Sequence, residues 1–252
     1  MQQKPLHGKV AVITGAGRGI GRAIAEAYAA AGAAIVCAAR SEAQLAEVVA
    51  AIQAAGGRAI AVPTDVTRLE PVERLYQRAV EAFGGVDIVV INAGGNMDRM
   101  PIETGDPAAW LATVELNLNG AYLTLKCALP HLRARGAGKI IAIGSGQGRR
   151  GSPGASSYSA AKAGLSLLVR VAAQELGETN ITVNELIPGP VRTALTADVE
   201  RRAAASGGTT PFTNPVEWIK QPEDVAPLAL FLATQPDRGP TGQTFSLMRR
   251  DM

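Results

Sequence analysis

The sequence predicts one α/β domain with a single doubly wound parallel sheet and helices on both faces. Short runs rich in Val, Ile and Ala alternate with longer helical stretches along all 252 residues. Such alternation is typical of a parallel sheet whose strands are buried on both sides. Because no linker and no internal repeat interrupts it, we expect a single domain over residues 1–252.

Each strand is predicted from a short β-branched or apolar run, and each helix from the stretch that follows such a run. We expect strands at 9–14, 34–39, 59–62, 87–91, 139–143, 181–187 and 243–247. We expect helices at 22–31, 42–55, 70–83, 107–132 (one or two helices) and 222–233, and a further one that carries Tyr158 and runs to about residue 178. Ser41 is a suitable N-cap, and Gly32 and Gly84 are suitable helix stops. The polar stretch 193–221 is expected to be a mobile substrate loop.

Composition excludes several classes of protein. The net charge of +3 and the 4% aromatic content argue against a nucleic-acid-binding surface. Cys37 and Cys127 lie in apolar segments and suggest reduced thiols, and together with His7 and His131 they show no metal-ligand spacing. No secretory leader and no membrane span is recognisable. We therefore expect a cytoplasmic protein with a small-molecule substrate, no metal, no nucleic acid and no membrane partner.

The first glycine-rich segment follows the first strand directly. Residues 15–21 read Gly-Ala-Gly-Arg-Gly-Ile-Gly and lead into an alanine-rich helix. Glycines let a backbone approach a pyrophosphate, and the N-terminus of a helix offers free N–H groups to it. The spacing is a variant of G-x-G-x-x-G, and a plain strand–turn–helix link is the alternative. The candidate cofactor-binding residues here are Gly15, Arg18, Gly19, Ile20 and Gly21.

The end of the second strand indicates the kind of dinucleotide. A carboxylate at this point usually holds the ribose 2′-hydroxyl of NAD, whereas an arginine suits the 2′-phosphate of NADP. This chain has Ala39 and Arg40, and Arg18 lies in the first turn. NADP is therefore expected, with NAD as the alternative if both arginines are merely solvated.

Other small or polar residues also fall at strand ends, where ligands bind in such sheets. Asp65 and Val66 follow the third strand, Asn92, Ala93 and Gly94 follow the fourth, and Ser145 follows the fifth. Asn117 interrupts an apolar helix, so its side chain needs hydrogen-bond partners.

Tyr158 and Lys162 are four residues apart in an apolar helical stretch. Residues at i and i+4 share one helix face, so the phenol and the ammonium would meet in one space. A neighbouring cation stabilises a phenolate and lowers the phenol's pKa from ~10. Such a tyrosine can act as a general acid or base. Taken alone, the pair could equally be an ordinary solvated pair.

Taken together, these motifs resemble the short-chain dehydrogenase/reductase family. The matching residues are Thr14 to Gly21, Asp65-Val66, Asn92-Ala-Gly94, Asn117, Ser145, Tyr158 with Lys162, and Pro188-Gly189 through Thr193. They follow the family's order over nearly the whole chain, and the resemblance is to members like 3-oxoacyl-carrier-protein reductases. The C-terminal segment after Thr241-Gly-Gln243 departs from the Val-Asp-Gly-Gly pattern common in the family.

The resemblance implies a role for each matching residue. Tyr158 would be the general acid/base, Lys162 would lower its pKa and hold the nicotinamide ribose, and Ser145 would orient the substrate oxygen. Asn117 would anchor a water molecule of a proton relay. Asp65 and Val66, Asn92 to Gly94, and the nicotinamide-framing set Pro188, Gly189, Val191 and Thr193 would bind the cofactor. A homotetramer is also implied, for which Ala160, Ala161, Ala163 and Gly164 would allow close helix packing.

The expected activity is NADP(H)-dependent hydride transfer to or from a carbonyl or secondary alcohol, either a 3-oxoacyl thioester or a small ketone. An NAD-dependent alcohol or polyol dehydrogenase is one alternative. A non-catalytic dinucleotide-binding sensor is another, against which the intact Ser145, Tyr158 and Lys162 argue. Arg149 and Arg150 follow the Ser145 turn and could admit an anionic substrate, or be solvated.

Overall fold

The computed structural model describes residues 4–194, 196–197, 200–201 and 218–249. Most of the predicted substrate loop at 193–221 therefore lies outside the described residues. No described helix is long and apolar enough to cross a membrane. Within the same ranges, no cluster of three or more His, Cys, Asp or Glu side chains is arranged to hold a metal ion.

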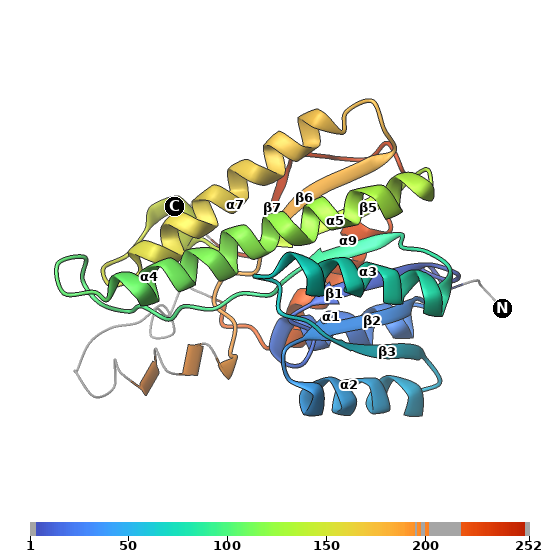
Figure 1. Cartoon of the computed structure of the whole chain (residues 1–252), viewed down its shortest axis with the longest axis horizontal. Helices are drawn as coiled ribbons and strands as arrows, with labels where there is room; N and C mark the ends of the chain where they lie inside the picture. Colours follow the sequence, from blue (N-terminus) through green and yellow to red (C-terminus); the bar gives the residue numbers. More distant parts are fainter. Residues whose placement is uncertain (1–3, 195, 198–199, 202–217, 250–252) are drawn as a thin grey trace.

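Seven strands form one parallel sheet in the order β3-β2-β1-β4-β5-β6-β7 (Figure 1). The order reverses between β1 and β4, from which the chain winds outward in both directions. The predicted doubly wound fold is confirmed. The strands are β1 Val10–Thr14, β2 Ala34–Ala39, β3 Arg58–Pro63, β4 Ile88–Ile91, β5 Gly138–Ile143, β6 Ile181–Ile187 and β7 Thr244–Ser246.

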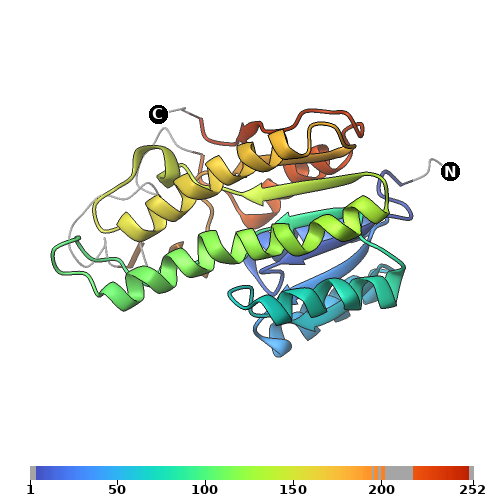
Figure 2. The same ribbon diagram turned by 45° about the horizontal axis from the view of Figure 1, so that its top comes forward.

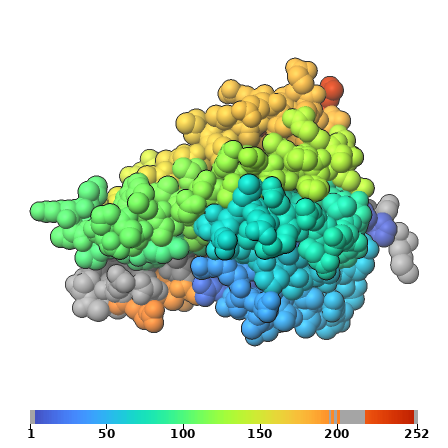
Figure 3. All heavy atoms as spheres, viewed as in Figure 1, coloured from blue at the N-terminus to red at the C-terminus, as the bar shows by residue number. Residues whose placement is uncertain are grey.

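Helices cover both faces of the sheet. On one face lie α1 (Gly19–Ala30), α2 (Glu42–Ala54) and α9 (Ala226–Ala233), and on the other lie α3 (Leu69–Phe83), α5 (Gly120–Ala134) and α7 (Ser156–Glu175). Figures 1 and 2 show α5 and α7 running side by side along the second face. The segment between β4 and α4 (Pro107–Val114) projects to the left of the molecule in Figure 3.

Alternate residues of each strand contribute to two separate cores. On β1, Ala11 and Ile13 pack in the core under α1, α2 and α9, whereas Val10 and Val12 pack in the core under α3, α5 and α7. Because both faces are buried, a strand needs apolar residues at every position. That is why the strands read as continuous apolar runs in the sequence.

Several element boundaries differ from those expected. Helix α1 begins at Gly19, not at residue 22, so the last glycines of the glycine-rich segment form its first turn. The stretch expected at 107–132 is helical throughout, with a π-helical turn at Glu115–Asn119 between α4 and α5. A short helix, α6 (Gln147–Arg150), occupies a stretch expected to be a loop. The helix expected at 222–233 opens with a 3-10 turn at Pro222–Val225.

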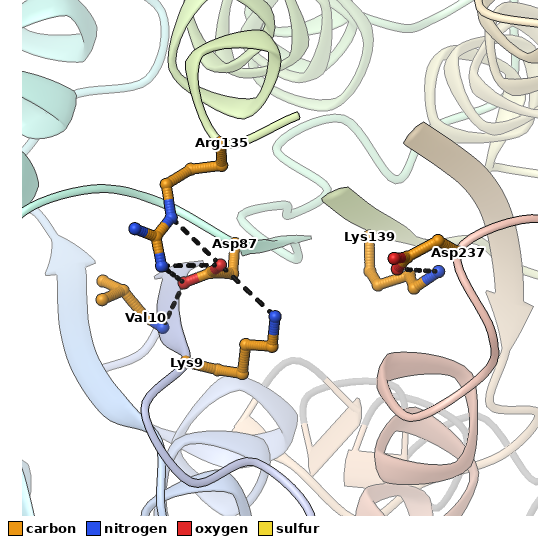
Figure 4. A network of polar contacts seen from close by, with 6 residues as sticks. All are labelled: Lys9, Val10, Asp87, Arg135, Lys139 and Asp237. Carbon is orange, nitrogen blue, oxygen red and sulfur yellow. Dashed lines mark hydrogen bonds and ion pairs between the residues drawn. The ribbon is translucent and has the colours of Figure 1, made fainter. Parts of the chain in front are cut away.

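The buried carboxylate of Asp87 links neighbouring strands at their amino ends (Figure 4). Ligands bind at the opposite, carboxyl ends of the strands in such sheets. Asp87 accepts a hydrogen bond from the backbone N–H of Val10 at 2.9 Å and from the guanidinium of Arg135 at 3.1–3.3 Å. Lys9 lies 3.6 Å from the same carboxylate. The bond to Val10 joins β1 to the residue that precedes β4, so Asp87 stabilises the central strand pair.

Candidate active site

The carboxyl ends of the strands open into a cleft of about 1680 Å³. A single small ligand usually needs only ~300–1,000 Å³, so this cleft has room for a dinucleotide and a second molecule. The predicted site residues that line it are Gly15, Arg18, Gly19, Ile20, Arg40, Asp65, Val66, Asn92, Ala93, Gly94, Ser145, Tyr158, Lys162, Pro188, Gly189, Val191 and Thr193. Two others, Gly21 and Asn117, are buried behind its wall.

The glycine-rich turn after β1 is tight enough to require glycine. Gly15 has φ +65°, and a Cβ on it would lie 2.7 Å from Nδ2 of Asn92. A Cβ on Gly21 would lie 2.5 Å from the same nitrogen. Asn92 Nδ2 donates hydrogen bonds to the carbonyl oxygens of Thr14, at 2.9 Å, and Gly15, at 3.2 Å. The side chain of Asn92 therefore braces the turn.

The same bracing continues through Thr14 at the end of β1. Its Oγ1 accepts from the backbone N–H groups of Asn92 and Ala93 at 3.0 and 3.2 Å, and donates to the Val90 carbonyl at 3.3 Å. These bonds join the ends of β1 and β4, where the strand order reverses. The two loops that form the floor of the cleft are thus held as one unit.

The N-terminus of α1 faces this floor. Its N-cap residue, Arg18, has an extended backbone and makes no side-chain capping bond. The first N–H groups of a helix have no partners within the helix, so those of the first turn of α1 are available to an anion. Gly19, with φ +57°, and Ile20 bring this turn to the cleft surface. The turn fits the pyrophosphate of a dinucleotide.

Two arginines mark the end of the cleft next to β2. Arg18 and Arg40 both line it, as does Asp65 after β3. Asp65 Oδ1 accepts hydrogen bonds from the backbone N–H and the hydroxyl of Thr67 at 3.0 and 2.8 Å. Burial opposes the ionisation of Asp65, but these bonds and the charges of Arg40 and Arg68 hold its pKa below the ordinary value. The carboxylate is thus already hydrogen-bonded within its own loop. Strand β2 itself ends at Ala39 and contains no acidic residue.

Tyr158, Lys162 and Ser145 meet near the middle of the cleft. Tyr158 and Lys162 lie one turn apart on α7, with Lys162 Nζ 5.7 Å from the centre of the phenol ring. The Tyr158 hydroxyl is within hydrogen-bonding reach of the Ser145 side chain. Lys162 Nζ also donates to the carbonyl of Ile143, the last residue of β5, at 2.8 Å. The predicted triad is therefore brought together, with α7 and the end of β5 supplying its members.

The ionisation of these groups is governed mainly by burial. Burial raises the pKa of Tyr158 above that of a free phenol, and Ser145 and the charge of Arg99 offset this only in part. In the chain alone the net pKa is raised, because desolvation of the phenolate outweighs the nearby charges. The expected lowering by Lys162 together with the oxidised nicotinamide stays a prediction for the cofactor-bound enzyme. Burial lowers the pKa of Lys162 to about 8, and the charge of Glu185 acts in the opposite direction.

Asn117 lies in the π-helical turn and is almost fully buried. Its Nδ2 donates to the carbonyls of Gly95, at 2.6 Å, and Thr113, at 2.7 Å, and its Oδ1 accepts from the N–H of Gly95 at 3.2 Å. A Cβ on Gly94 would lie 2.7 Å from that Oδ1 and 3.6 Å from Lys162 Nζ. The side chain of Asn117 therefore shapes the loop that passes beside Lys162, and its amide hydrogens are used by the protein.

The segment after β6 closes the cleft on the side opposite to the loop at Asn92. Gly189, with φ +70°, turns the chain, and a Cβ on Gly19 would touch Thr193 at 3.4 Å. Thr196 Oγ1 donates to the Val191 carbonyl at 2.8 Å and fixes this segment. The segment faces the first turn of α1 directly, as expected for a wall around a bound nicotinamide.

Arg99 and Met248 line the cleft and were not singled out in the sequence, nor was Glu185, which is buried next to Gly144 in the cleft wall. Arg99 lies in the loop after β4, and Arg150 lines the cleft near it, whereas Arg149 does not. The thioether of Met248 covers Gly146, so the unusual C-terminal segment folds over the cleft of its own chain. Glu185 could have been noticed in the sequence, because it is a carboxylate inside the largely apolar strand Ile181–Ile187.

Comparisons with known proteins agree with this geometry. A family model described as short chain dehydrogenase matches residues 9–204. The chain is 40% identical over 230 residues to cis-4-hydroxycyclohexanecarboxylate dehydrogenase of Sinomonas cyclohexanicum, covering 90% of this chain and 89% of that protein. It is 38% identical over 248 residues to a 3-oxoacyl-[acyl-carrier-protein] reductase of Synechocystis, covering 96% of each.

Solved structures show the same fold. A short-chain type dehydrogenase/reductase from Mycobacterium ulcerans superposes with a TM-score of 0.89 at 31% identity, over 96% of this chain and 89% of that one. A dehydrogenase/reductase from Sinorhizobium meliloti 1021 does so with a TM-score of 0.82 at 34% identity, over 97% of this chain and 95% of that one. The chain belongs to the short-chain dehydrogenase/reductase family of NAD(P)-dependent oxidoreductases.

Proposed function

We propose that the chain is an NADP(H)-dependent enzyme that transfers a hydride between the nicotinamide and a carbonyl or secondary alcohol. The observation that carries this proposal is the placement of the Tyr158 hydroxyl, the Ser145 side chain and the Lys162 ammonium around one part of the cleft. Two hydroxyl groups beside a fixed cation are suited to bind and protonate one substrate oxygen. A non-catalytic sensor would not need this arrangement.

The preference for NADP(H) is supported by the charges beside β2. Arg18 and Arg40 line the end of the cleft where the adenosine would lie, and Ala39 stands where NAD-binding chains carry a carboxylate. A guanidinium forms strong, charge-assisted hydrogen bonds with a phosphate. The negative charge of Asp65 is offset by the nearby charges of Arg40 and Arg68, which contribute to its lowered pKa.

The protein's part in the reaction is the handling of one proton. The nicotinamide, when bound, supplies or accepts the hydride. In reduction, the Tyr158 hydroxyl donates its proton to the substrate oxygen as that oxygen gains negative charge. In oxidation, the phenolate removes the proton from the substrate hydroxyl. Ser145 orients the oxygen through a hydrogen bond, and the Lys162 ammonium stabilises the nearby phenolate.

The substrate is proposed to carry an anionic group at a distance from the reacting carbon. Arg99 and Arg150 line the same cleft as Tyr158, and the charge of Arg99 acts on the Tyr158 phenol. One relative is named for a hydroxycyclohexanecarboxylate and another for a 3-oxoacyl carrier-protein substrate. A carboxylated cyclic alcohol and a 3-oxoacyl thioester are thus the two substrates to test first.

The test is a substrate panel in both directions with each cofactor, followed by nicotinamide absorbance. The panel contains cis-4-hydroxycyclohexanecarboxylate, its uncharged cyclohexanol analogue, and a 3-oxoacyl thioester. We expect faster turnover with NADP(H) than with NAD(H), and faster turnover of cis-4-hydroxycyclohexanecarboxylate than of its uncharged analogue. Tight dinucleotide binding without turnover of any carbonyl or alcohol would favour the sensor instead.

We also propose that the protein is a cytoplasmic, single-domain homotetramer. Helices α4, α5 and α7 expose the apolar side chains of Leu111, Tyr122, Leu167 and Val171. The small residues expected at the interface divide into two groups: Ala161 and Gly164 pack inside their own chain, and Ala160 and Ala163 are exposed. Sedimentation of a stable monomer at micromolar concentration would exclude this assembly.

A further inference from the structure

Glu185 is a buried carboxylate in a row of side chains that is otherwise apolar. On β6, Ile181 and Val183 belong to the core under α7, and side chains of a strand alternate between its faces. Glu185 is therefore the next residue of that row and faces α7. It pairs in register with Ala142, which belongs to the same core. Only 2% of Glu185 is exposed.

The contacts of this carboxylate reach three elements around the active site. Its Oε2 accepts hydrogen bonds from the hydroxyls of Ser166 on α7 and Thr244 on β7, each at 2.8 Å. Its Oε1 packs against Gly144, where an added Cβ would overlap it. Gly144 directly precedes Ser145. The carboxylate thus fixes the turn that carries Ser145.

The same carboxylate lies close to the buried ammonium of Lys162. Ser166 is one helical turn beyond Lys162, and Lys162 Nζ binds the carbonyl of Ile143, the residue before Gly144. The two opposite charges therefore contact neighbouring residues at the end of β5. Other groups around Lys162 are the Tyr158 phenol on its own helix, Asn117 from the π-helical turn, Arg99 from the loop after β4, and Arg150 of α6.

We propose that Glu185 is a positioning residue that keeps the Lys162 ammonium protonated and holds the Ser145 turn in place. This rests on the proposed function, because Lys162 acts by its charge beside Tyr158. A buried lysine without a counter-charge tends to lose its proton. An uncharged Lys162 would no longer stabilise the phenolate.

The size of the expected effect on Lys162 follows from its pKa. Burial already lowers the pKa of Lys162 to about 8, and Glu185 opposes that shift. An opposite charge at close range moves a pKa by ~1 unit or more. Without the carboxylate, the pKa of Lys162 should fall further, so a larger share of the molecules would carry a neutral lysine at physiological pH.

The direct test measures the protonation of Lys162 in the full chain without cofactor. Competitive acetylation across a pH series, read by mass spectrometry, gives the midpoint for Lys162 in the unmodified protein, Glu185→Gln and Glu185→Asp. We expect the midpoint to fall by ~1 unit in Glu185→Gln and to return toward normal in Glu185→Asp, which restores the charge. An unchanged midpoint in Glu185→Gln would overturn the inference.

Two further variants separate charge from structure. Ser166→Ala removes one hydrogen bond to the carboxylate but keeps the charge, so its midpoint should stay normal. Glu185→Leu continues the apolar row and, as an apolar replacement for a buried charge, is expected to fold if Glu185→Gln does not. It should show the same lowered midpoint. A midpoint that falls equally in Ser166→Ala would mean that disturbed packing is the cause, and would also overturn the inference.

A pH profile of alcohol oxidation provides the functional readout. With a neutral Lys162, the phenolate of Tyr158 is less stable, so the rising limb of the profile should move to higher pH in Glu185→Gln but not in Ser166→Ala. A profile of Glu185→Gln that coincides with that of the unmodified enzyme would contradict the proposal. Because the acetylation experiment needs no turnover, failure of the inference about Glu185 can be distinguished from failure of the proposed function.

Discussion

Replacing Tyr158 by Phe tests the central chemical claim, because it removes one oxygen atom and keeps the ring. The ring packs on α7 beside Lys162, and the lost hydroxyl has Ser145 as its neighbour. Loss of one such hydrogen bond costs ~0.5–1.5 kcal/mol of stability, so the variant should fold and bind cofactor. Loss of a general acid should reduce turnover by ~10²–10⁴-fold. That factor corresponds to roughly 3–5 kcal/mol of activation free energy.

The pH dependence adds a second, independent measurement. In oxidation Tyr158 must be deprotonated, so the rate should rise as pH passes through its pKa. In reduction it must be protonated, so the rate should fall over the same range. Because burial raises the pKa of Tyr158, we expect the oxidation rate to be still rising above neutral pH. The positive charge of the oxidised nicotinamide should shift this range downward when it is bound.

The assay is steady-state turnover in both directions with cofactor affinity measured separately by fluorescence. Ser145→Ala serves as the matched control, since it removes the neighbouring hydroxyl but leaves the proposed proton donor. It should lose less activity than Tyr158→Phe, and its oxidation rate should still rise with pH as in the unmodified enzyme. If Tyr158→Phe retained near-normal turnover, or kept the same pH limb, the proton would have to come from another group and the reasoning would be refuted.

Three further predictions test other parts of the molecule. Arg40→Asp should lower kcat/KM with NADP by ~10–100-fold, which is what the loss of one charge-assisted hydrogen bond costs, and should reverse the cofactor preference. Equal efficiency of the unmodified protein with NADP and NAD would contradict the role of Arg40. Arg150→Gln should raise KM for a carboxylated substrate by about tenfold and leave an uncharged analogue unchanged, whereas Arg149→Gln, outside the cleft, should change neither. Asp87→Ala leaves the buried Val10 N–H without an acceptor and should cost ~1–3 kcal/mol in urea unfolding, with activity of the folded enzyme intact. The control is Asp237→Ala. The Asp237 carboxylate is 62% exposed, so its loss should lower the free energy of unfolding by less than ~1 kcal/mol. Equal losses in the two variants would show that the buried contacts of Asp87 do not contribute more to stability than an exposed ion pair.

Local sequence predicted the central strands well because they are buried on both faces. Continuous runs such as Ala34–Ala39 and Ile181–Ile187 have the bounds expected of them. Helix ends were predicted less well. The start of α1 was placed too late, since glycine is a poor helix former by propensity, and here Gly19 and Gly21 are retained because close backbone approach outweighs that cost.

The sequence named the candidate site residues, whose roles stay predictions, but not their electrostatics. Motif order and spacing are enough to name Ser145, Tyr158 and Lys162, because the carboxyl ends of parallel strands meet at one edge. The direction of the Tyr158 pKa shift depends on how deeply the phenol is enclosed, and enclosure is a property of the packed chain. The sequence also did not reveal that the side-chain amides of Asn92 and Asn117 brace the loops beside the cleft, while their expected roles toward the cofactor and a water molecule stay predictions.

What the sequence by itself determined was the fold class, the family resemblance and the candidates for the reacting groups, since these depend on local patterns and on spacing along the chain. Only the tertiary structure decided which distant charges act on those groups. Arg99 and Glu185 lie 59 and 27 residues from Tyr158 in the sequence, by difference of their numbers, yet both belong to the surroundings of the triad. Coulombic interaction depends on separation in space and on burial, and neither quantity exists until the strands have assembled into the sheet.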